Sequence, residues 1–457
     1  MSADDSDNNG HRLPDGDDGF PARIVVWGGG YVGLSAAMAF ADAGIDVQVI
    51  DVDQARVDEI NEGRVDSMPL FERWSGQQLL PLVDAGMITA ATELSPGSDQ
   101  DESLVHLIAV PTESSGIPRM EIIDDVLSRI DDSWGRLCII ESTITPGMGA
   151  ELQRRYPGVR LAVAPRRDWF LGEGKDLKNL TRVVGGASPA IARDAVRVLS
   201  RVSDHIQVAS NCDVAALTKC LENSLHHIRA MFACQVSRAF PDVDVNEAFD
   251  LAASHWRIGV QYFASAGTGG YCLPVSSHHL LTGASQPEVL SIAEDACLFE
   301  EEQRAFVIDR LQEEGSTFAV IGLAYRADVP STVLSPALAV SQGLVRQGSK
   351  VQAHDPYLGP AAVAELTGAV PMDDLQGLGE VDVIVVGPGH AEYRDLFTEP
   401  DAWDTLRSGQ LVFDLGGEFE DLRSRFHEHG IDYVRVGDPG WHRPRQRERR
   451  PAEFGHV

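Results

Sequence analysis

The sequence predicts an α/β fold in which two Rossmann-like, doubly wound parallel sheets are joined by a central α-helical section. Three observations predict it. Short apolar runs alternate with helical patterns up to about residue 187, strand patterns then vanish until about residue 310, and the alternation resumes afterwards. A chain of 457 residues also exceeds the roughly 250 to 300 residues at which a single core stops growing.

These shifts divide the chain into five segments. We expect an acidic, disordered tail (1–20), a first α/β domain (21–187), a helical section (188–313), a second α/β domain (314–440), and an Arg- and Pro-rich tail (441–457) that is solvated or docks on its own chain.

The first strand pattern, Ile24–Trp27, runs directly into a glycine-rich turn and an Ala-rich helical pattern. Gly28 permits a tight strand-to-helix turn, Gly30 lets the backbone approach a pyrophosphate, and Gly33 allows the helix to pack closely on the strand. The pyrophosphate would then contact free amides at the helix start, where Tyr31 and Val32 lie.

A second strand pattern, Val47–Ile50, ends at Asp51, where a carboxylate can accept hydrogen bonds from an adenosine ribose. An acid at this place favours NAD over NADP. Strand, glycines, helix, strand and acid in this order predict an NAD site, although an empty α/β turn would show similar glycines.

The remaining strand patterns complete the two sheets. Two strand ends of the first domain carry polar residues suited to a ligand, Val110–Thr112 and Glu141–Thr143. The first strand of the second domain again enters a glycine turn, Gly322–Tyr325, so one half could hold the cofactor and the other the substrate. The patterns are Leu104–Val110, Leu137–Ile140, Leu161–Ala164 and Val183–Gly185 in the first domain, and Phe318–Gly322, Val351–Asp355, Val381–Val386, Leu411–Asp414 and Tyr433–Val436 in the second.

Composition restricts the partners and the compartment. The net charge of −31, with only four lysines, argues against nucleic acid and anionic membranes and indicates a halophilic source. The six cysteines lack metal-ligand spacing, so we expect free thiols and no metal. With no long apolar run and an acidic N-terminus, we expect a cytoplasmic protein.

Two positions in the helical section suggest chemistry. Lys219 and Asn223 are four residues apart, so a helix would place both on one face, where they could stabilise an alkoxide that loses hydride. Cys272 follows a glycine loop, and its thiolate could attack an aldehyde to give a thiohemiacetal and then a thioester. Taken singly, each has a plainer interpretation. Lys219 could be a surface lysine with no relation to Asn223, and Cys272 could be a small buried hydrophobic side chain.

Together these residues resemble the UDP-glucose/GDP-mannose dehydrogenase family of nucleotide-sugar dehydrogenases over about residues 22–440. The resemblance is carried by the glycine turn with Asp51, the two polar strand ends, and further segments: Leu217–Lys219 with Glu222 and Asn223, Gly269–Pro274, the turn Gly322–Tyr325 followed by Ser335 and Pro336, and Asp355–Pro356.

The resemblance implies two successive NAD-dependent oxidations of a sugar C6 hydroxyl to a carboxylate, feeding cell-surface polysaccharide or protein glycan synthesis. It also implies a homodimer, or a higher homo-oligomer, built on the central helices, and a nucleotide sugar as partner. It assigns Cys272 as nucleophile and Lys219 with Asn223 as oxyanion stabilisers. It gives the cofactor Asp51, Arg56, Thr112 and Thr143, and the substrate Gly267, Gly269, Gly270, Tyr325 and Arg326.

Several positions depart from the family pattern. Arg166 stands where a glutamate usually activates the hydrolytic water, and Glu173 is the nearest replacement. Ser276 replaces an aspartate four residues after the cysteine, and Arg326 replaces a lysine. Other changes are Pro330, Ser331 and Val333 in place of two Asp and one Arg, His226 in place of Arg, and Cys234 and Gln235 in place of Asn and Glu.

Two alternatives stay open. A dehydrogenase that uses Cys272 only structurally would perform one oxidation and produce one NADH per substrate. A catalytically degenerate relative would bind a sugar nucleotide and serve a regulatory or scaffolding role in glycan assembly; Arg166, Ser276 and Val333 favour it.

Overall fold

A computed structural model describes most of the chain. The described residues are 23–68, 71–94, 104–114, 116–130, 136–168, 175–260, 262–270, 272–398, 403 and 405–443. The expected acidic tail and most of the C-terminal tail lie outside them. The chain forms two compact units, one from residues 1–222 and 278–287 and the other from residues 223–277 and 288–457.

The first unit is built on an eight-stranded sheet with the order β10-β9-β8-β7-β4-β1-β2-β3. Its inner strands are almost completely buried and, apart from Arg23 and His106, apolar, because helices cover both faces. The strands are β1 (Arg23–Trp27), β2 (Asp46–Ile50), β3 (Ile88–Ala91), β4 (Val105–Ile108), β7 (Leu137–Ile140), β8 (Arg160–Val163), β9 (Arg182–Gly186) and β10 (Ile206–Ala209), and β5 (Glu113–Ser114) with β6 (Ile117–Pro118) forms a separate small hairpin.

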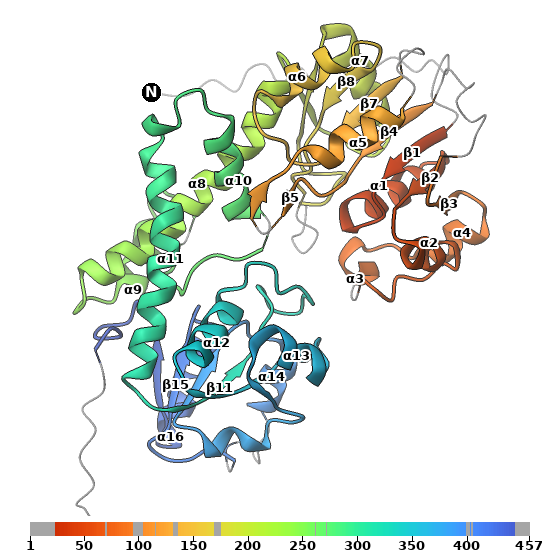
Figure 1. Cartoon of the computed structure of the whole chain (residues 1–457). Coiled ribbons are helices and arrows are strands. Elements are labelled where there is room, and N and C mark those ends of the chain that lie inside the picture. The colour runs from red at the N-terminus through yellow and green to blue at the C-terminus, as the bar shows by residue number, and fades with distance from the viewer. Residues whose placement is uncertain are drawn as a thin grey trace, which may run out of the picture. The chain divides into compact units, whose positions relative to one another are not determined.

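Helices of the first unit connect these strands (Figure 1). Local capping explains several of their starts: Asp53 accepts from Ala55 N at α2, and Ser188 accepts from Ile191 N at α7. The helices are α1 (Tyr31–Asp42), α2 (Gln54–Asn61), α3 (Phe71–Ser75), α4 (Leu80–Asp84), α5 (Glu121–Arg129), α6 (Met148–Arg155) and α7 (Pro189–Leu199).

Two expectations for this sheet were wrong in detail. β8 and β9 pair antiparallel, so the sheet is not parallel throughout. Strand structure also does not stop at residue 189, because β10 extends the sheet after α7. β10 is an edge strand of four residues with no fully buried side chain, so its apolar pattern is too weak to read.

The helical section confirms the expected change of pattern after the first sheet. After β10, the described residues of this section form four α-helices and a short 3₁₀ helix, and the helices α8 and α10 each contribute residues to both compact units. The elements are α8 (Cys212–Ala239), α9 (Val245–Ala253), α10 (Cys272–Gly283), η3 (Pro287–Val289) and α11 (Ser291–Gln312). No helix of the described residues is long and apolar enough to cross a bilayer.

The second unit carries a six-stranded, fully parallel sheet with the order β13-β12-β11-β14-β15-β16. This order, with the first strand central, confirms a second Rossmann-like half. Its strands are β11 (Thr317–Ile321), β12 (Lys350–His354), β13 (Val370–Pro371), β14 (Val383–Val386), β15 (Leu411–Asp414) and β16 (Asp432–Arg435), and its helices are α12 (Pro336–Arg346), α13 (Pro360–Thr367), η4 (Gln376–Glu380), α14 (Ala391–Leu396), η5 (Glu420–Leu422) and α16 (Arg423–Glu428).

The start of the expected C-terminal tail belongs to this second core. Trp441 is 1% exposed and packs within the core of the second sheet. Arg310 of α11 donates to the carbonyls of Trp441 and Arg443. The first three residues of the expected tail therefore dock on their own chain, which is one of the two behaviours that we expected for it.

Candidate active site

The glycine turn between β1 and α1 has the geometry that its sequence predicts. Gly28 has a φ of +97°, and a Cβ added there would lie 2.4 Å from the carbonyl oxygen of Ala109. A Cβ on Gly33 would lie 1.9 Å from the carbonyl oxygen of Gly28. Neither position can hold a side chain without moving backbone.

The start of α1 is open to a ligand. A Cβ added to Gly30 would meet no described atom within 4 Å, and no side chain caps the helix there. An uncapped helix start with space beside its first glycine is the arrangement that can bind a phosphate.

Asp51 lies beside this turn. Its Oδ2 accepts a hydrogen bond from Gly29 N at 2.6 Å, and its Oδ1 accepts from Asp53 N. Arg56 of α2 is close to the same glycine, and its buried Nη1 has no hydrogen-bond partner among the described residues. The open helix start, the carboxylate and the unpaired guanidinium nitrogen fit an NAD molecule.

Two strand ends meet next to this turn. Thr112 follows β4 and donates from Oγ1 to the carbonyl of Thr143 at 2.6 Å, while Ser142 donates to the carbonyl of Val110 at 2.7 Å. These bonds fix both strand ends in the place where open α/β sheets bind ligands.

Arg166 is engaged inside the first unit. It is 8% exposed, pairs with Asp168 at 2.6 Å, and donates to the carbonyl of Val32 at 3.0 Å. It therefore links the segment after β8 to the first turn of α1, a role that sequence spacing did not suggest. Glu173, the proposed substitute for the missing carboxylate, lies outside the described residues.

In the second unit, Cys272 is the first residue of α10. All six cysteines lie in described segments, and Cys272 is the exposed one; four others are buried and Cys297 is intermediate. Burial raises the pKa of the Cys234 thiol to about 11. Exposure therefore separates Cys272 from the other five cysteines.

The glycine loop before Cys272 packs against Tyr325. Gly267 and Gly270 have φ values of +137° and +76°, and added Cβ atoms on Gly269 and Gly270 would each lie 2.9 Å from Tyr325 atoms. Burial, and after it the charge of Cys272, raises the pKa of Tyr325. The structure thus brings the predicted loop, Tyr325 and the thiol together, and Arg326 follows as a partly buried residue.

Asn223 lies on α8 and donates from Nδ2 to Ser276 Oγ of α10 at 2.8 Å. Ser276 was singled out as a departure, and the structure shows that its hydroxyl anchors the predicted oxyanion stabiliser. Lys219 lies four residues earlier on α8 and is partly exposed.

Sequence patterns assigned no role to two buried acidic residues of the second unit, although Asp355 lies in one of the segments that carry the family resemblance. Asp355 follows β12 and accepts from the amides of Leu323 and Ala324 at 2.7 and 3.0 Å, which closes the second glycine turn. Glu300 of α11 binds the glycine loop through Thr268 at 2.6 Å. Asp355 follows a strand, as Asp51 does, and could have been found; Glu300 sits among other acidic residues and gives no such signal.

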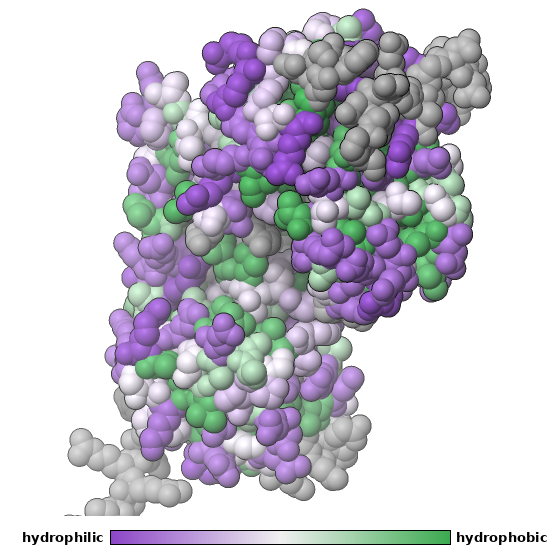
Figure 2. Space-filling model, turned by 45° about the vertical axis from the view of Figure 1, so that its right-hand side comes forward, coloured by the Kyte–Doolittle hydropathy of each residue, from purple (hydrophilic) through white to green (hydrophobic). Residues whose placement is uncertain are grey.

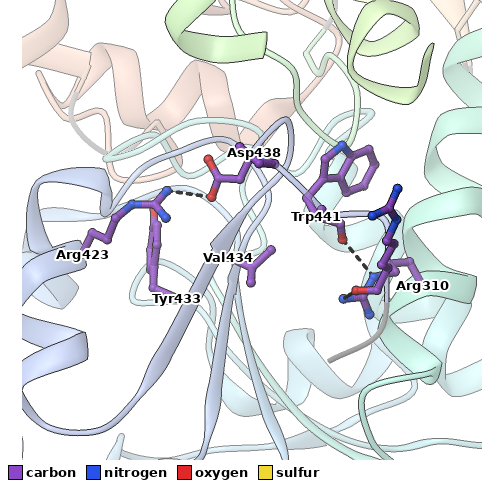
Figure 3. Close-up of a pocket in the computed structure, with 9 residues that line it drawn as sticks. Arg310, Arg423, Tyr433, Val434, Asp438 and Trp441 are labelled. Carbon is purple, nitrogen blue, oxygen red and sulfur yellow. Dashed lines mark hydrogen bonds and ion pairs between the residues drawn. The ribbon is translucent and has the colours of Figure 1, made fainter. Parts of the chain in front are cut away.

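A cavity lies beside the edge strand β16 and the segment that follows it (Figure 3). Its volume is about 520 Å³. Its arginines are already paired with carboxylates: Arg423 with Asp438 at 2.7 Å and Arg310 with Glu314 at 2.6 Å. None of the predicted site residues lines it. We therefore assign it no ligand.

Comparison with known proteins decides the family. The sequence matches three domain descriptions of one family, UDP-glucose/GDP-mannose dehydrogenase: the NAD binding domain over residues 22–203, the central domain over residues 213–295 and the UDP binding domain over residues 319–420. The chain belongs to the UDP-glucose/GDP-mannose dehydrogenase family. Its cofactor is NAD.

Individual relatives agree with this assignment. The chain is 27% identical over 398 residues to UDP-N-acetyl-D-mannosamine dehydrogenase of Pyrococcus horikoshii, covering 82% of this chain and 91% of the relative. It is 26% identical over 378 residues to UDP-glucose 6-dehydrogenase of Pseudomonas aeruginosa, covering 76% and 82%. These relatives support the general reaction of a nucleotide-sugar dehydrogenase.

The fold agrees as well. A solved structure of the UDP-D-ManNAc dehydrogenase from Pyrococcus horikoshii superposes with a TM-score of 0.76 at 24% identity and covers 92% of this chain and all of the other.

Proposed function

We propose that this family member oxidises the C6 hydroxyl of a UDP- or GDP-linked hexose or N-acetylhexosamine to a carboxylate in two NAD-dependent steps. The observation that carries the proposal is the exposed Cys272, which begins α10 directly after the glycine loop and lies beside Tyr325. An exposed thiol in a ligand-binding loop is the group that a second oxidation through a covalent intermediate requires.

NAD bound at the start of α1 supplies the hydride acceptor for both steps. In the first step the alcohol loses a hydride and a proton to become an aldehyde. We assign Lys219 and the Asn223 amide to the developing oxyanion, because both are hydrogen-bond donors on one face of α8.

In the second step the Cys272 thiolate adds to the aldehyde carbon and forms a thiohemiacetal. Loss of a second hydride from that carbon gives a thioester. Water then adds to the thioester carbonyl, the C–S bond breaks, and carboxylate and thiol are released. Arg166 has a guanidinium in place of the family's carboxylate and is held by Asp168 and Val32 in the first unit. It therefore cannot activate this water as a base, and we keep Glu173 as the proposed base.

The proposal extends to assembly and setting. Large apolar side chains of the central helices are exposed, among them Leu225, Phe232 and Leu251, and Trp256 just after α9 is exposed as well. Figure 2 shows many hydrophilic residues on the face that it presents. Exposed apolar side chains that gather on one set of elements favour a homodimer through these helices. We place the enzyme in a high-salt cytoplasm, where its product would enter cell-surface or protein glycan synthesis.

A direct test supplies purified protein with NAD and a panel of UDP- and GDP-sugars in molar KCl, and counts NADH per sugar consumed. Two NADH per sugar, with a carboxylate product, are expected. One NADH per sugar would favour the single oxidation instead. A rise in melting temperature with a sugar nucleotide but no turnover across the panel would favour a binding role.

A further inference from the structure

A chain of polar side chains crosses the interior of the second unit and has no role in the chemistry described above. It joins four elements: Ser277 of α10, His227 of α8, Glu300 of α11 and Thr268 of the glycine loop. Ser277 and His227 are fully buried and Glu300 is 3% exposed.

The contacts are continuous. His227 Nδ1 lies 3.0 Å from Ser277 Oγ, and its Nε2 lies 3.2 Å from Glu300 Oε2. The other carboxylate oxygen, Glu300 Oε1, accepts from Thr268 N at 2.6 Å and from Thr268 Oγ1 at 2.7 Å. One carboxylate therefore binds the loop with one oxygen and the α8–α10 pair with the other.

Glu300 is held as an anion. Arg304 of the same helix lies 3.0 Å from its Oε1. Burial alone would raise the pKa of Glu300, but the hydrogen bond from His227 and the charge of Arg304 outweigh burial and lower the pKa to about 2. A buried carboxylate needs such partners, because an unpaired one would be strongly unfavourable.

The opposite side of the loop is fixed by different residues. Gly270 N donates to the carbonyl of Val333 at 2.9 Å, and Tyr325 packs against Gly269 and Gly270. The loop is thus held between the carboxylate of α11 and the segment after β11, and Cys272 follows two residues after Gly270.

We propose that Glu300, acting with His227, is a positioning residue for the reaction. It fixes the sugar-nucleotide loop at Thr268 and, through His227 and Ser277, ties that loop to α10, the helix that begins with Cys272. The expected effect on KM rests on the proposed function, whereas the fixing of the loop rests on the contacts of Glu300 and His227 alone.

Simple stabilisation of the helix packing explains these contacts less well. Apolar side chains of similar volume would hold α8, α10 and α11 together at least as well as a buried ion pair. What they could not do is accept two hydrogen bonds from Thr268 and so set the path of the loop. The Glu300 carboxylate therefore sets the conformation of the glycine loop in addition to packing the helices together.

The kinetic test compares Glu300→Gln with Glu301→Gln, a matched control at the next position, where the side chain is exposed. Glu300→Gln removes the charge that pairs with Arg304 and replaces one of the two acceptor oxygens with an amide nitrogen. The anchor of the loop is weakened, so we expect KM for the sugar nucleotide to rise about tenfold. KM for NAD should stay unchanged, because the NAD turn lies in the other unit. Glu301→Gln should match the parent in both constants.

A second pair of variants tests the same contact without changing a buried charge. Thr268→Val removes the hydroxyl donor and Thr268→Ser restores it. We expect the valine variant to share the raised KM for the sugar nucleotide and the serine variant to stay near the parent. This pair keeps the test valid if Glu300→Gln does not fold.

Hydrogen–deuterium exchange supplies a readout that needs no turnover. The Thr268 amide is bound to Glu300 in the parent, so the peptide covering residues 264–270 should exchange faster in Glu300→Gln and no faster in Glu301→Gln. Unchanged exchange in Glu300→Gln and Thr268→Val would overturn the positioning role. If Glu300→Gln exchanges faster but the parent turns over no sugar nucleotide, the proposed function is contradicted and the positioning role is not. If Glu300→Gln exchanges faster but its KM for the sugar nucleotide equals that of the parent, the kinetic part of this inference is overturned.

Discussion

At the scale of single residues, a sequence identifies a functional residue when the local backbone allows only one residue type at that position. Gly28 and Gly33 were predictable because a strand-to-helix turn leaves no room for a Cβ. The partners of Arg166 were not, since its bond to the carbonyl of Val32 joins residues 134 positions apart. Such a contact depends on how the sheet assembles, and no short pattern records it.

Replacing Cys272 tests the covalent step. Cys272→Ser should lower carboxylate formation by about a thousandfold or more, because an alkoxide is not available as a nucleophile at neutral pH and an ester replaces the thioester. Some aldehyde should still form. Cys297→Ser, at the half-exposed cysteine, is the control. Product analysis by mass spectrometry would contradict the assignment if both variants made carboxylate at the parent rate.

His106 predicts a pH dependence of stability. It is 1% exposed, accepts from Trp27 Nε1 at 3.1 Å, and burial followed by the charge of Arg136 lowers its pKa to about 3 from 6.5. Between these values the unfolded chain binds the proton and the folded chain does not. The free energy of unfolding should therefore fall as pH falls through this window, by up to about 1.4 kcal/mol per pH unit from this group.

His106→Gln keeps an acceptor for Trp27 and removes the titration. Its free energy of unfolding should fall less steeply between pH 6.5 and 4 than that of the parent, as measured by denaturant unfolding at constant KCl. Parallel curves for the two proteins would exclude this contribution. His279, whose pKa burial lowers to about 4, titrates in both proteins and does not affect the comparison.

Helices, strands and loops were predictable where an element is long or buried on both faces. β1, β4 and β7 are apolar apart from Arg23 and His106, because the sheet is covered on both sides. The edge strands β3, β10 and β13 escaped prediction because each is short and partly exposed. The antiparallel pairing of β8 and β9 also leaves no mark in either strand's own sequence.

The glycine loop is the element on which substrate binding should depend most. Gly270 has a φ of +76°, which is strained for alanine, and the new methyl group of Gly270→Ala would lie 2.9 Å from the Tyr325 ring. The loop must therefore move in this variant. We expect KM for the sugar nucleotide to rise by about tenfold or more.

Gly348→Ala is the matched control for this change. Its φ of +85° gives the same backbone strain, and its Cβ would meet nothing within 4 Å. That variant should lose about 1 kcal/mol of stability and keep the parent kinetics. Equal KM values for both variants and the parent would show that the loop does not shape the substrate site.

At the scale of the whole molecule, charge sets the working conditions. A net charge of −31 makes the folded chain repel itself at low ionic strength. The Debye length falls from about 10 Å in 0.1 M salt to about 3 Å in 1 M, so the melting temperature should rise by about 5 °C or more over this range of KCl. A neutral osmolyte at equal osmolality should raise it less, and a Tm independent of KCl would contradict the proposed high-salt setting.

The measurement that tests the central claim most directly is acid quenching of the enzyme during turnover, followed by mass spectrometry of its peptides. Our account predicts a sugar nucleotide attached to the peptide that contains Cys272, with the mass of the thioester left by two oxidations. A protein that released carboxylate while Cys272 stayed unmodified at every time point, or that carried the adduct on another residue, would contradict it.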